Sequence, residues 1–225
     1  MQTDMESALV IGASGGIGGA LTSALRAQGV VVNALSRRDD GLDVTDEDSV
    51  AAALEPLEGP FDLIFVATGG LEIAGRGPEK TLRALSARAL AAQFALNAIG
   101  PALVLAHAPR LMPRDRRAVF AALSARVGSI GDNRAGGWYG YRAAKAALNQ
   151  LLHTAAIELA RTHPRAVVAA LHPGTVRTSL TADYLGRHPA VDPEASAGNL
   201  LRVVSHLSHE QSGGFFDWAG KEIPW

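Results

Sequence analysis

Short apolar runs alternate with stretches of helical periodicity along the chain. The first apolar run, ALVIGA at residues 8–13, is too short for a helix and ends close to a glycine, which is typical of a strand. Behind it Ile17, Leu21 and Leu25 recur at helical spacing. Gly29 is placed to end that helix. Strands that alternate with helices in this way indicate βαβ units, in which the strands pair in parallel.

The same pattern continues to the end of the sequence. Strands are predicted over residues 8–13, 31–35, 41–44, 61–67, 118–124, 166–172 and 213–220. Helices are predicted from Ile17 to Gly29, over 45–54, over one or two segments between about 79 and 111, over 141–162 and near 194–208. The pattern therefore predicts one α/β domain over residues 1–225. We expect a Rossmann-type doubly wound, mostly parallel seven-stranded sheet with helices on both faces.

Composition and charge argue against several classes of function. The net charge is −1, so neither a nucleic acid nor an anionic membrane surface is expected as a partner. The chain has no cysteine, which excludes disulfides, thiol catalysis and cysteine-ligated metals. The histidines are scattered, and the pair His206 and His209 has no obvious third ligand. We therefore expect no metal site.

The chain is expected to be soluble and cytoplasmic. Its first residues, MQTDMES, lack the cationic start of a secretory signal. The most apolar stretch, residues 89–109, is interrupted by polar residues such as Gln93 and Asn97 and by Gly100 and Pro101. A membrane span needs about 20 mostly apolar residues without such interruptions.

A glycine-rich turn follows the first predicted strand. Gly12, Gly16 and Gly18 lie between that strand and the next helix. Glycine at these positions permits a tight turn and lets a pyrophosphate approach the backbone. The helix N-terminus then offers free N–H groups and the positive end of its dipole. The alternative is a turn of purely structural purpose.

The residues after the second strand favour a 2′-phosphate. The sequence there reads SRRDD, so Arg37 and Arg38 are the first charges. Guanidinium groups at this point suit the 2′-phosphate of NADP(H), whereas a carboxylate would favour NAD(H). Asp39 and Asp40 could neutralise these arginines in a solvated turn. NADP(H) is therefore the expected cofactor, with NAD(H) as the alternative.

Tyr141 and Lys145 form a candidate proton-transfer pair. They are four residues apart on a predicted helix and so share one face, whereas Tyr139, six residues before Lys145, points elsewhere. A free tyrosine has a pKa of about 10, and a nearby ammonium should lower it. The pair suits a reaction in which Tyr141 gives a proton to a carbonyl oxygen while hydride arrives at carbon.

Together with the glycine turn, these residues resemble the short-chain dehydrogenase/reductase family over essentially the whole chain. Residues 12–18, GASGGIG, resemble that family's G-x-x-x-G-x-G cofactor turn, and Tyr141 and Lys145 resemble its catalytic pair. Asn97 matches a helix asparagine that helps to hold the water of a proton relay. Residues 173–178, PGTVRT, are similar to the P-G-x-V-x-T segment that docks the nicotinamide.

The resemblance implies a catalytic set and a cofactor site. The implied catalytic residues are Asn97, Ser124, Tyr141 and Lys145. The implied cofactor-binding residues are Gly12, Ser14, Gly15, Gly16, Ile17, Gly18, Ser36, Arg37, Arg38, Asp43, Val44, Ala67, Thr68, Gly69, Tyr141, Lys145, Pro173, Gly174, Val176 and Thr178. Within these sets Asp43 and Val44 would contact adenine. Lys145 would also hold the nicotinamide ribose, and Thr178 would meet its carboxamide.

A narrower resemblance, to the C-factor group of this family, rests on three segments. They are residues 124–130, 136–149 and 215–225. The wider family resemblance also implies a homodimer or homotetramer. The segment 174–194 is expected to form a short lid over a small substrate.

The chain departs from the family pattern at three places. Ile11 stands where a threonine is usual, and Val66-Ala67-Thr68-Gly69 replaces NNAG. The position of the usual catalytic serine is Ala125, so Ser124 or Ser129 would have to supply the hydroxyl. Loss of such a donor can lower a rate by about 10²–10³-fold.

Two functions from different classes follow. The first is an NADP(H)-dependent oxidoreductase of the carbonyl reductase type, acting on a small carbonyl or alcohol. The second is an NADP-binding sensor or cell-signalling protein with little or no turnover, which Ala125 and the C-factor resemblance favour. Epimerase-like and methyltransferase-like activities fit less well, because the lid is short and the Tyr141–Lys145 pair has no role in methyl transfer.

Overall fold

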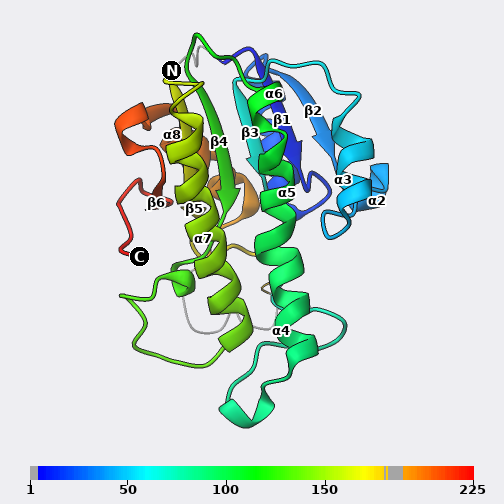
Figure 1. The fold of residues 1–225 in the computed structure, drawn as a ribbon, viewed down its shortest axis with the longest axis vertical. Helices are drawn as coiled ribbons and strands as arrows, with labels where there is room; N and C mark the ends of the chain where they lie inside the picture. Colours follow the sequence, from blue (N-terminus) through cyan, green and yellow to red (C-terminus); the bar gives the residue numbers. More distant parts are fainter. Residues whose placement is uncertain (1–4, 180, 182–189) are drawn as a thin grey trace.

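The computed structural model describes residues 5–179, 181 and 190–225. Within these residues six parallel strands form one sheet in the order β2-β1-β3-β4-β5-β6 (Figure 1). The strands are β1 (Ser7–Ile11), β2 (Val31–Leu35), β3 (Leu63–Val66), β4 (Ala118–Leu123), β5 (Ala166–His172) and β6 (Gly214–Asp217). The chain runs outward from β1 in both directions, so the fold is doubly wound and the predicted fold class is confirmed.

Helices connect the strands. In the described part of the chain they are α1 (Gly16–Ala27), α2 (Arg37–Asp40), α3 (Glu47–Leu54), α4 (Ala87–Phe94), α5 (Gly100–Ala106), α6 (Ala108–Leu111), α7 (Tyr139–Leu159) and α8 (Pro193–His206). A π-helical turn, η2 (Ala95–Ile99), joins α4 to α5. The short 3₁₀ turns are η1 (Leu82–Ala84), η3 (Arg126–Gly128) and η5 (His209–Gln211).

The prediction of a seventh strand over residues 41–44 is wrong. Gly41 adopts a left-handed conformation and ends α2, and the Leu42 N–H donates back to the Ser36 carbonyl. The next N–H, that of Asp43, donates to Ser49 Oγ. These backbone donors are satisfied locally, so the segment has no reason to extend the sheet beyond β2.

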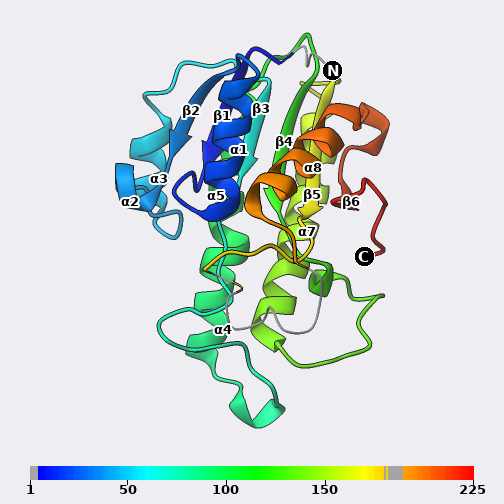
Figure 2. The same ribbon diagram turned by 180° about the vertical axis from the view of Figure 1, so that it is seen from behind.

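Alternate residues of each strand face two separate cores. Leu9 and Ile11 pack in a core beneath α3, α5 and α7, which cover one face of the sheet (Figure 1). Ala8 and Val10 pack in a core beneath α1 and α8, which cover the other face (Figure 2). This alternation follows from the two-residue period of a strand, and burial on both faces explains why the strands are apolar throughout.

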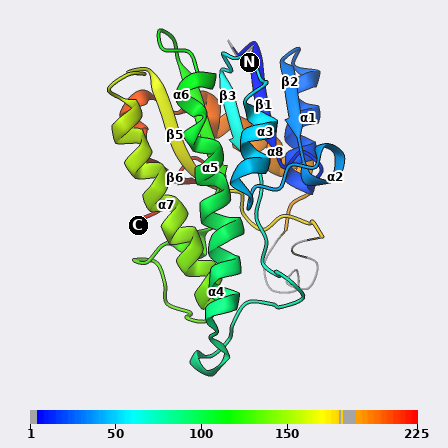
Figure 3. The same ribbon diagram turned by 45° about the vertical axis from the view of Figure 1, so that its right-hand side comes forward.

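All strands point the same way, so their carboxyl ends share one edge of the sheet. The segments beginning at Gly12, Ala67, Ser124 and Pro173 follow β1, β3, β4 and β5 at that edge. In Figure 3, α4 and the first turns of α7 extend past this edge. The sequence-predicted motifs are therefore gathered at one end of the molecule.

One described stretch, Ala87–Ala106, is long and apolar enough to cross a membrane by length and composition, with a mean hydropathy of 1.7. In the fold it comprises α4, the π turn and α5, and it packs against α7. Its polar residues Gln93 and Asn97 are buried and hydrogen-bonded to the loop after β3. These contacts favour a helix of the folded domain over a membrane span.

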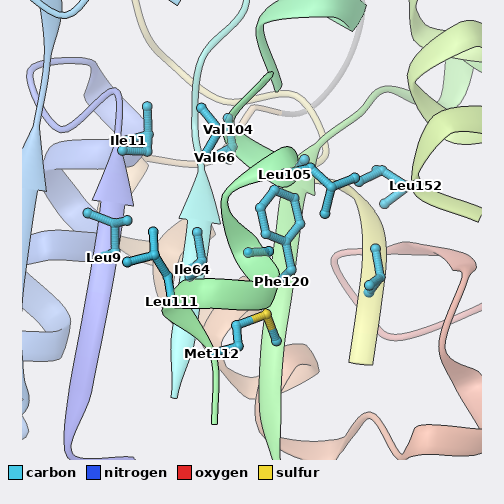
Figure 4. Close-up of a cluster of buried hydrophobic side chains, with 14 of the residues drawn as sticks. Leu9, Ile11, Ile64, Val66, Val104, Leu105, Leu111, Met112, Phe120 and Leu152 are labelled. Atoms are coloured by element: carbon cyan, nitrogen blue, oxygen red, sulfur yellow. The ribbon is translucent and has the colours of Figure 1, made fainter. Parts of the chain in front are cut away.

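Phe120 occupies the centre of the core beneath α5 and α7. It lies on β4 opposite Ile64 of β3, in the cluster that also contains Met112 and Leu152 (Figure 4). Its side chain is fully buried.

We expect Phe120→Ala to lower the free energy of unfolding by about 3–5 kcal/mol, because it removes buried apolar surface and leaves a cavity. Urea unfolding followed by circular dichroism measures this change. Leu82→Ala is the control, since Leu82 is 69% exposed and should change stability by less than about 0.5 kcal/mol. Equal losses in the two variants would contradict the assignment of the core.

Candidate active site

A cavity of about 820 Å³ opens where the order of the strands reverses, between the ends of β1 and β3. Its size is typical of small-molecule and cofactor sites. Its wall includes the predicted residues Gly12, Ser14, Gly15, Gly16, Ile17, Ser36, Arg37, Arg38, Asp43, Val44, Ala67, Thr68, Gly69, Ser124, Tyr141, Lys145, Pro173 and Thr178. It also includes Ile11, Leu42, Glu72, Leu96, Leu123 and Ser179, which the sequence did not indicate.

The glycine turn forms one end of the cavity. Gly12 has a φ of +88°, which favours glycine, and its N–H donates to the Leu35 carbonyl. Gly18 lies outside the wall, but a Cβ there would come within 2.2 Å of the Gly12 carbonyl oxygen. The N-cap residue Gly15 makes no side-chain cap, and the first turn of α1 carries no acid. The first N–H groups of α1 are therefore free to bind an anion, and the glycine turn fits a pyrophosphate.

The segment after β5 lies across this turn. A Cβ on Gly16 would come within 2.8 Å of Thr178 Cγ2, so the two residues are in close contact. Gly174 and Val176 do not line the cavity: Gly174 has a φ of +79° and abuts Trp218, whereas Val176 is buried.

The predicted lid over 174–194 includes residues 180 and 182–189, which lie outside the described residues. Its two described ends are tied together. Arg177 Nε donates to Asp192 Oδ1 at 2.8 Å, and the Arg177 N–H donates to the Val191 carbonyl at 2.9 Å. The beginning and the end of the segment thus leave the fold side by side.

The two arginines after β2 differ in their surroundings. Arg38 makes two hydrogen bonds to the carboxylate of Asp39, at 2.8 and 3.0 Å. Arg37 makes no ion pair within the described residues. Hydrogen bonds from Thr45 lower the pKa of Asp43, and the charge of Arg37 adds to that effect. Arg37 is thus the guanidinium of this pair that lines the cavity wall without an ion-pair partner among the described residues.

Tyr141 and Lys145 line the opposite end of the cavity, as their four-residue spacing predicts. They are 8% and 2% exposed, and Lys145 Nζ lies 5.8 Å from the centroid of the Tyr141 ring. Nζ donates to the Leu123 carbonyl at the end of β4 at 2.8 Å. Tyr139 does not line the cavity.

Burial dominates the ionisation of this pair. It raises the pKa of Tyr141 above its ordinary value of 10, and it lowers the pKa of Lys145 from 10.5 to about 7. Both shifts disfavour the charged forms, because a charge loses solvation in the interior. From the sequence we expected the ammonium to lower the pKa of Tyr141, but burial raises it instead. Tyr141 is thus a neutral phenol that can donate its proton.

Asn97 lies behind the cavity wall. Its Nδ2 donates to the Gly70 carbonyl at 2.9 Å and to Gln93 Oε1 at 2.7 Å, and its Oδ1 accepts the Gly70 N–H at 3.0 Å. A Cβ on Gly69 would lie 3.1 Å from Asn97 Oδ1 and 3.3 Å from Lys145 Nζ. The side chain of Asn97 therefore holds the loop after β3 close against Lys145. It does so from a π-helical turn, a conformation that is frequent at functional sites.

The structure separates the two candidate serines. Ser124 is 3% exposed, lines the cavity and donates from Oγ to Asn149 Oδ1 at 2.6 Å. Ser129 Oγ instead donates to the Pro224 carbonyl and accepts the Asp132 N–H, so it faces the C-terminus. Ser124 is the serine that shares the cavity with Tyr141.

Two further residues support α7, and neither was predicted from the sequence. Glu79 is buried and accepts the Gly140 N–H at 3.0 Å, so it caps a helix whose own first turn has no acid. No local signal could reveal it, because it lies 61 residues before Gly140. Asn149 repeats the four-residue spacing once more after Lys145, and that spacing was a usable signal.

Comparison with known proteins agrees with the Rossmann-type architecture described above. A family model described as enoyl-(acyl carrier protein) reductase matches residues 12–206. The chain is 30% identical to 1-hydroxy-2-glutathionyl-2-methyl-3-butene dehydrogenase of Rhodococcus sp. (strain AD45) over 236 residues, which cover 98% of this chain and 100% of the relative. It is 38% identical to C-signal of Myxococcus xanthus over 138 residues, which cover 60% of this chain and 78% of the relative.

A solved structure, the NADPH-bound carbonyl reductase from chicken fatty liver, has the same fold. Its TM-score is 0.81 at 23% identity, covering 100% of this chain and 96% of that one. The chain belongs to the short-chain dehydrogenase/reductase family of oxidoreductases. The match to C-signal agrees with the narrower resemblance to the C-factor group.

We expect Lys145→Met to alter the pH dependence of stability. The unfolded chain keeps the lysine proton up to the ordinary pKa of 10.5, whereas the folded chain loses it at about 7. Between these values the unfolded state binds more protons, so the free energy of unfolding of the natural chain rises with pH, by up to about 1.4 kcal/mol per pH unit. The variant lacks this contribution.

Urea unfolding of both proteins between about pH 7 and about pH 9 tests this. The difference in unfolding free energy, variant minus natural chain, should fall as pH rises. A difference that stays constant over this range would show that burial does not lower the pKa of Lys145 in the folded chain.

Proposed function

We propose that the chain is an NADP(H)-dependent oxidoreductase that interconverts a small carbonyl compound and its alcohol. The observation that carries this proposal is one cavity with the glycine turn at one end and Tyr141, Lys145 and Ser124 at the other. When bound, the cofactor supplies or accepts the hydride.

Each site residue has a separate role in the proposed reaction. Burial keeps Tyr141 protonated, so its proton is available for the carbonyl oxygen during reduction. Ser124 donates a hydrogen bond to the same oxygen. Lys145 holds the ribose and, once charged, favours the phenolate that the reaction leaves. Asn97 keeps the loop after β3 in place against Lys145.

Arg37 supports the preference for NADP(H). It lines the cavity without a carboxylate partner among the described residues, whereas Arg38 is paired with Asp39. The carbonyl reductase from chicken fatty liver, which shares the fold, binds NADPH. We propose Arg37 as the group that holds the 2′-phosphate.

Self-association and location remain part of the proposal. Ile99 on η2 and Leu151 and Ile157 on α7 are apolar and exposed. These side chains lie on neighbouring helices, which supports a homodimer or homotetramer. A cytoplasmic location is proposed from the sequence.

The second candidate function is an NADP-binding signalling protein with little turnover. Ala125 at the usual serine position and the similarity to C-signal favour it. The position of Ser124 favours the enzyme, because its hydroxyl lines the same cavity as Tyr141 although residue 125 is an alanine.

Tyr141→Phe should lower kcat by about 10²–10⁴-fold, because it removes the proton donor. NADPH oxidation with a panel of aldehydes, ketones and quinones measures turnover, and quenching of NADPH fluorescence measures binding. Binding should be unchanged in the variant. Tight NADPH binding without turnover of any panel member by the natural chain would favour the signalling protein.

Arg37→Ala should weaken NADPH binding by about 10- to 100-fold, because a charged hydrogen-bond donor to the 2′-phosphate is lost. Binding of NADH should hardly change. The control is the double variant Arg38→Ala/Asp39→Ala, which removes a paired and exposed couple without changing the net charge and should cost less than about fivefold. Equal losses of NADPH affinity in the two variants would contradict the assignment of Arg37.

A further inference from the structure

Helix α7 presents a third polar side chain to the end of β4. Tyr141, Lys145 and Asn149 follow one another at four-residue spacing and so lie along one face of the helix. Lys145 and Asn149 are each 2% exposed. The roles proposed above use Tyr141 and Lys145 and leave the buried amide of Asn149 without one.

Asn149 contacts the serine of the site directly. Ser124 Oγ donates to Asn149 Oδ1 at 2.6 Å, one residue after the Leu123 carbonyl that accepts from Lys145 Nζ. The other end of the amide, Nδ2, is buried and has no hydrogen-bond partner among the described residues. The amide is therefore satisfied at its oxygen and unsatisfied at its nitrogen, which is unfavourable in a buried position.

This arrangement conflicts with the role of Ser124. A serine hydroxyl has one proton, and here that proton is given to Asn149. Ser124 cannot at the same time donate it to a carbonyl oxygen in the cavity. A half-turn of the amide about its last bond removes the conflict, because Nδ2 then faces Ser124 Oγ and donates to it. The serine proton becomes available to the cavity.

We propose that Asn149 is the positioning residue for Ser124. Its amide accepts from the hydroxyl when no carbonyl oxygen is present and donates to it when one is bound, so that Ser124 can then serve the substrate. An amide offers a donor at one end and an acceptor at the other, so either end can serve the hydroxyl. The inference rests on the proposed function, since it concerns how the reaction's hydrogen-bond donor is prepared.

Two variants of Asn149 separate this role from a structural one. Asn149→Asp has the same shape but, when ionised, only accepts, so it keeps the observed hydrogen bond and holds the serine proton away from substrate. Asn149→Leu removes both functions and leaves the hydroxyl free to turn. We expect Asn149→Asp to lower kcat by about 10²-fold, close to Ser124→Ala. Asn149→Leu should lower kcat less, by about tenfold or below. The Ser124 hydroxyl can still donate in this variant, although it is no longer positioned.

Burial raises the pKa of the introduced carboxyl, so kcat is measured from about pH 7 to about pH 9, and the loss in Asn149→Asp should deepen as the carboxyl ionises. The KM for NADPH should stay within about twofold in both variants, as expected when only a transition-state interaction is lost. A purely structural role predicts the opposite order, with Asn149→Asp the milder change, and that order would overturn the inference.

The Ser124→Ala background is the matched control, because Asn149→Asp also places a charge four residues from Lys145. If Asn149 acts through the serine, adding Asn149→Asp to Ser124→Ala should change kcat by less than about twofold, as for residues that act as a unit. If Asn149→Asp lowers kcat in the Ser124→Ala background as much as it does in the natural chain, the effect acts through Lys145 and the inference is contradicted.

A measurement on the natural chain does not depend on the folding of the variants. The side-chain amide protons of Asn149 are followed by NMR as NADP⁺ and the carbonyl compound chosen by the turnover panel are added. One proton should move downfield as it begins to donate to Ser124 Oγ, and it should not move in Ser124→Ala. If the protein reduces the carbonyl compound but the chemical shifts of the Asn149 amide protons do not change, the inference about Asn149 is wrong and the proposed function stands. NADPH binding without reduction of any carbonyl would overturn the proposed function, and this role with it.

Discussion

The hydrogen bond from Lys145 Nζ to the Leu123 carbonyl joins the helix α7 to the carboxyl end of β4. It is made by an amine that is almost completely buried, next to Gly69, where a Cβ would come within 3.3 Å of Nζ. Because the lysine has lost most of its solvation there, its ammonium form is disfavoured and the few groups around it matter greatly. The rest of the site is arranged around this one contact. Gly69 and Asn97 close one side, Tyr141 lies one turn earlier on α7, and Ser124 follows Leu123.

Burial gives this site its chemical character. Burial pushes both the phenol of Tyr141 and the amine of Lys145 towards their neutral forms, so the phenol keeps the proton that a reduction requires. The opposite end of the cavity has the reverse character, with backbone N–H groups and the charge of Arg37 suited to phosphates. The cavity thus joins an end suited to anions to an end suited to proton transfer, and the proposed dinucleotide-dependent reduction needs both.

Local patterns in the sequence were enough for the fold and for part of the site. The apolar runs that became β1, β3, β4 and β5 are buried on both faces, and such runs are recognisable without tertiary information. The segment 41–44 looked like a strand, but a left-handed Gly41 and the Ser49 hydroxyl satisfy its backbone instead. The Tyr141–Lys145 pair could be predicted because helix spacing alone brings the two residues to one face.

Contacts between distant segments could not be predicted in this way. The choice between Ser124 and Ser129 depends on where the chain turns after β4, and the sequence left both open. Glu79 reaches Gly140 across 61 residues, and the burial that reverses the expected pKa shift of Tyr141 comes from the whole cavity. Asn149 lies between these cases, since its spacing was visible but its contact with Ser124 depends on how α7 docks against β4.

A crystal structure with NADP⁺ bound would test the central claim most directly, through the positions of the Tyr141 hydroxyl and Ser124 Oγ relative to the nicotinamide C4 atom. The account predicts that both oxygens face one small space beside C4, within hydrogen-bonding reach of a carbonyl oxygen placed there. A nicotinamide bound elsewhere, or a Tyr141 hydroxyl turned away from C4, would contradict it.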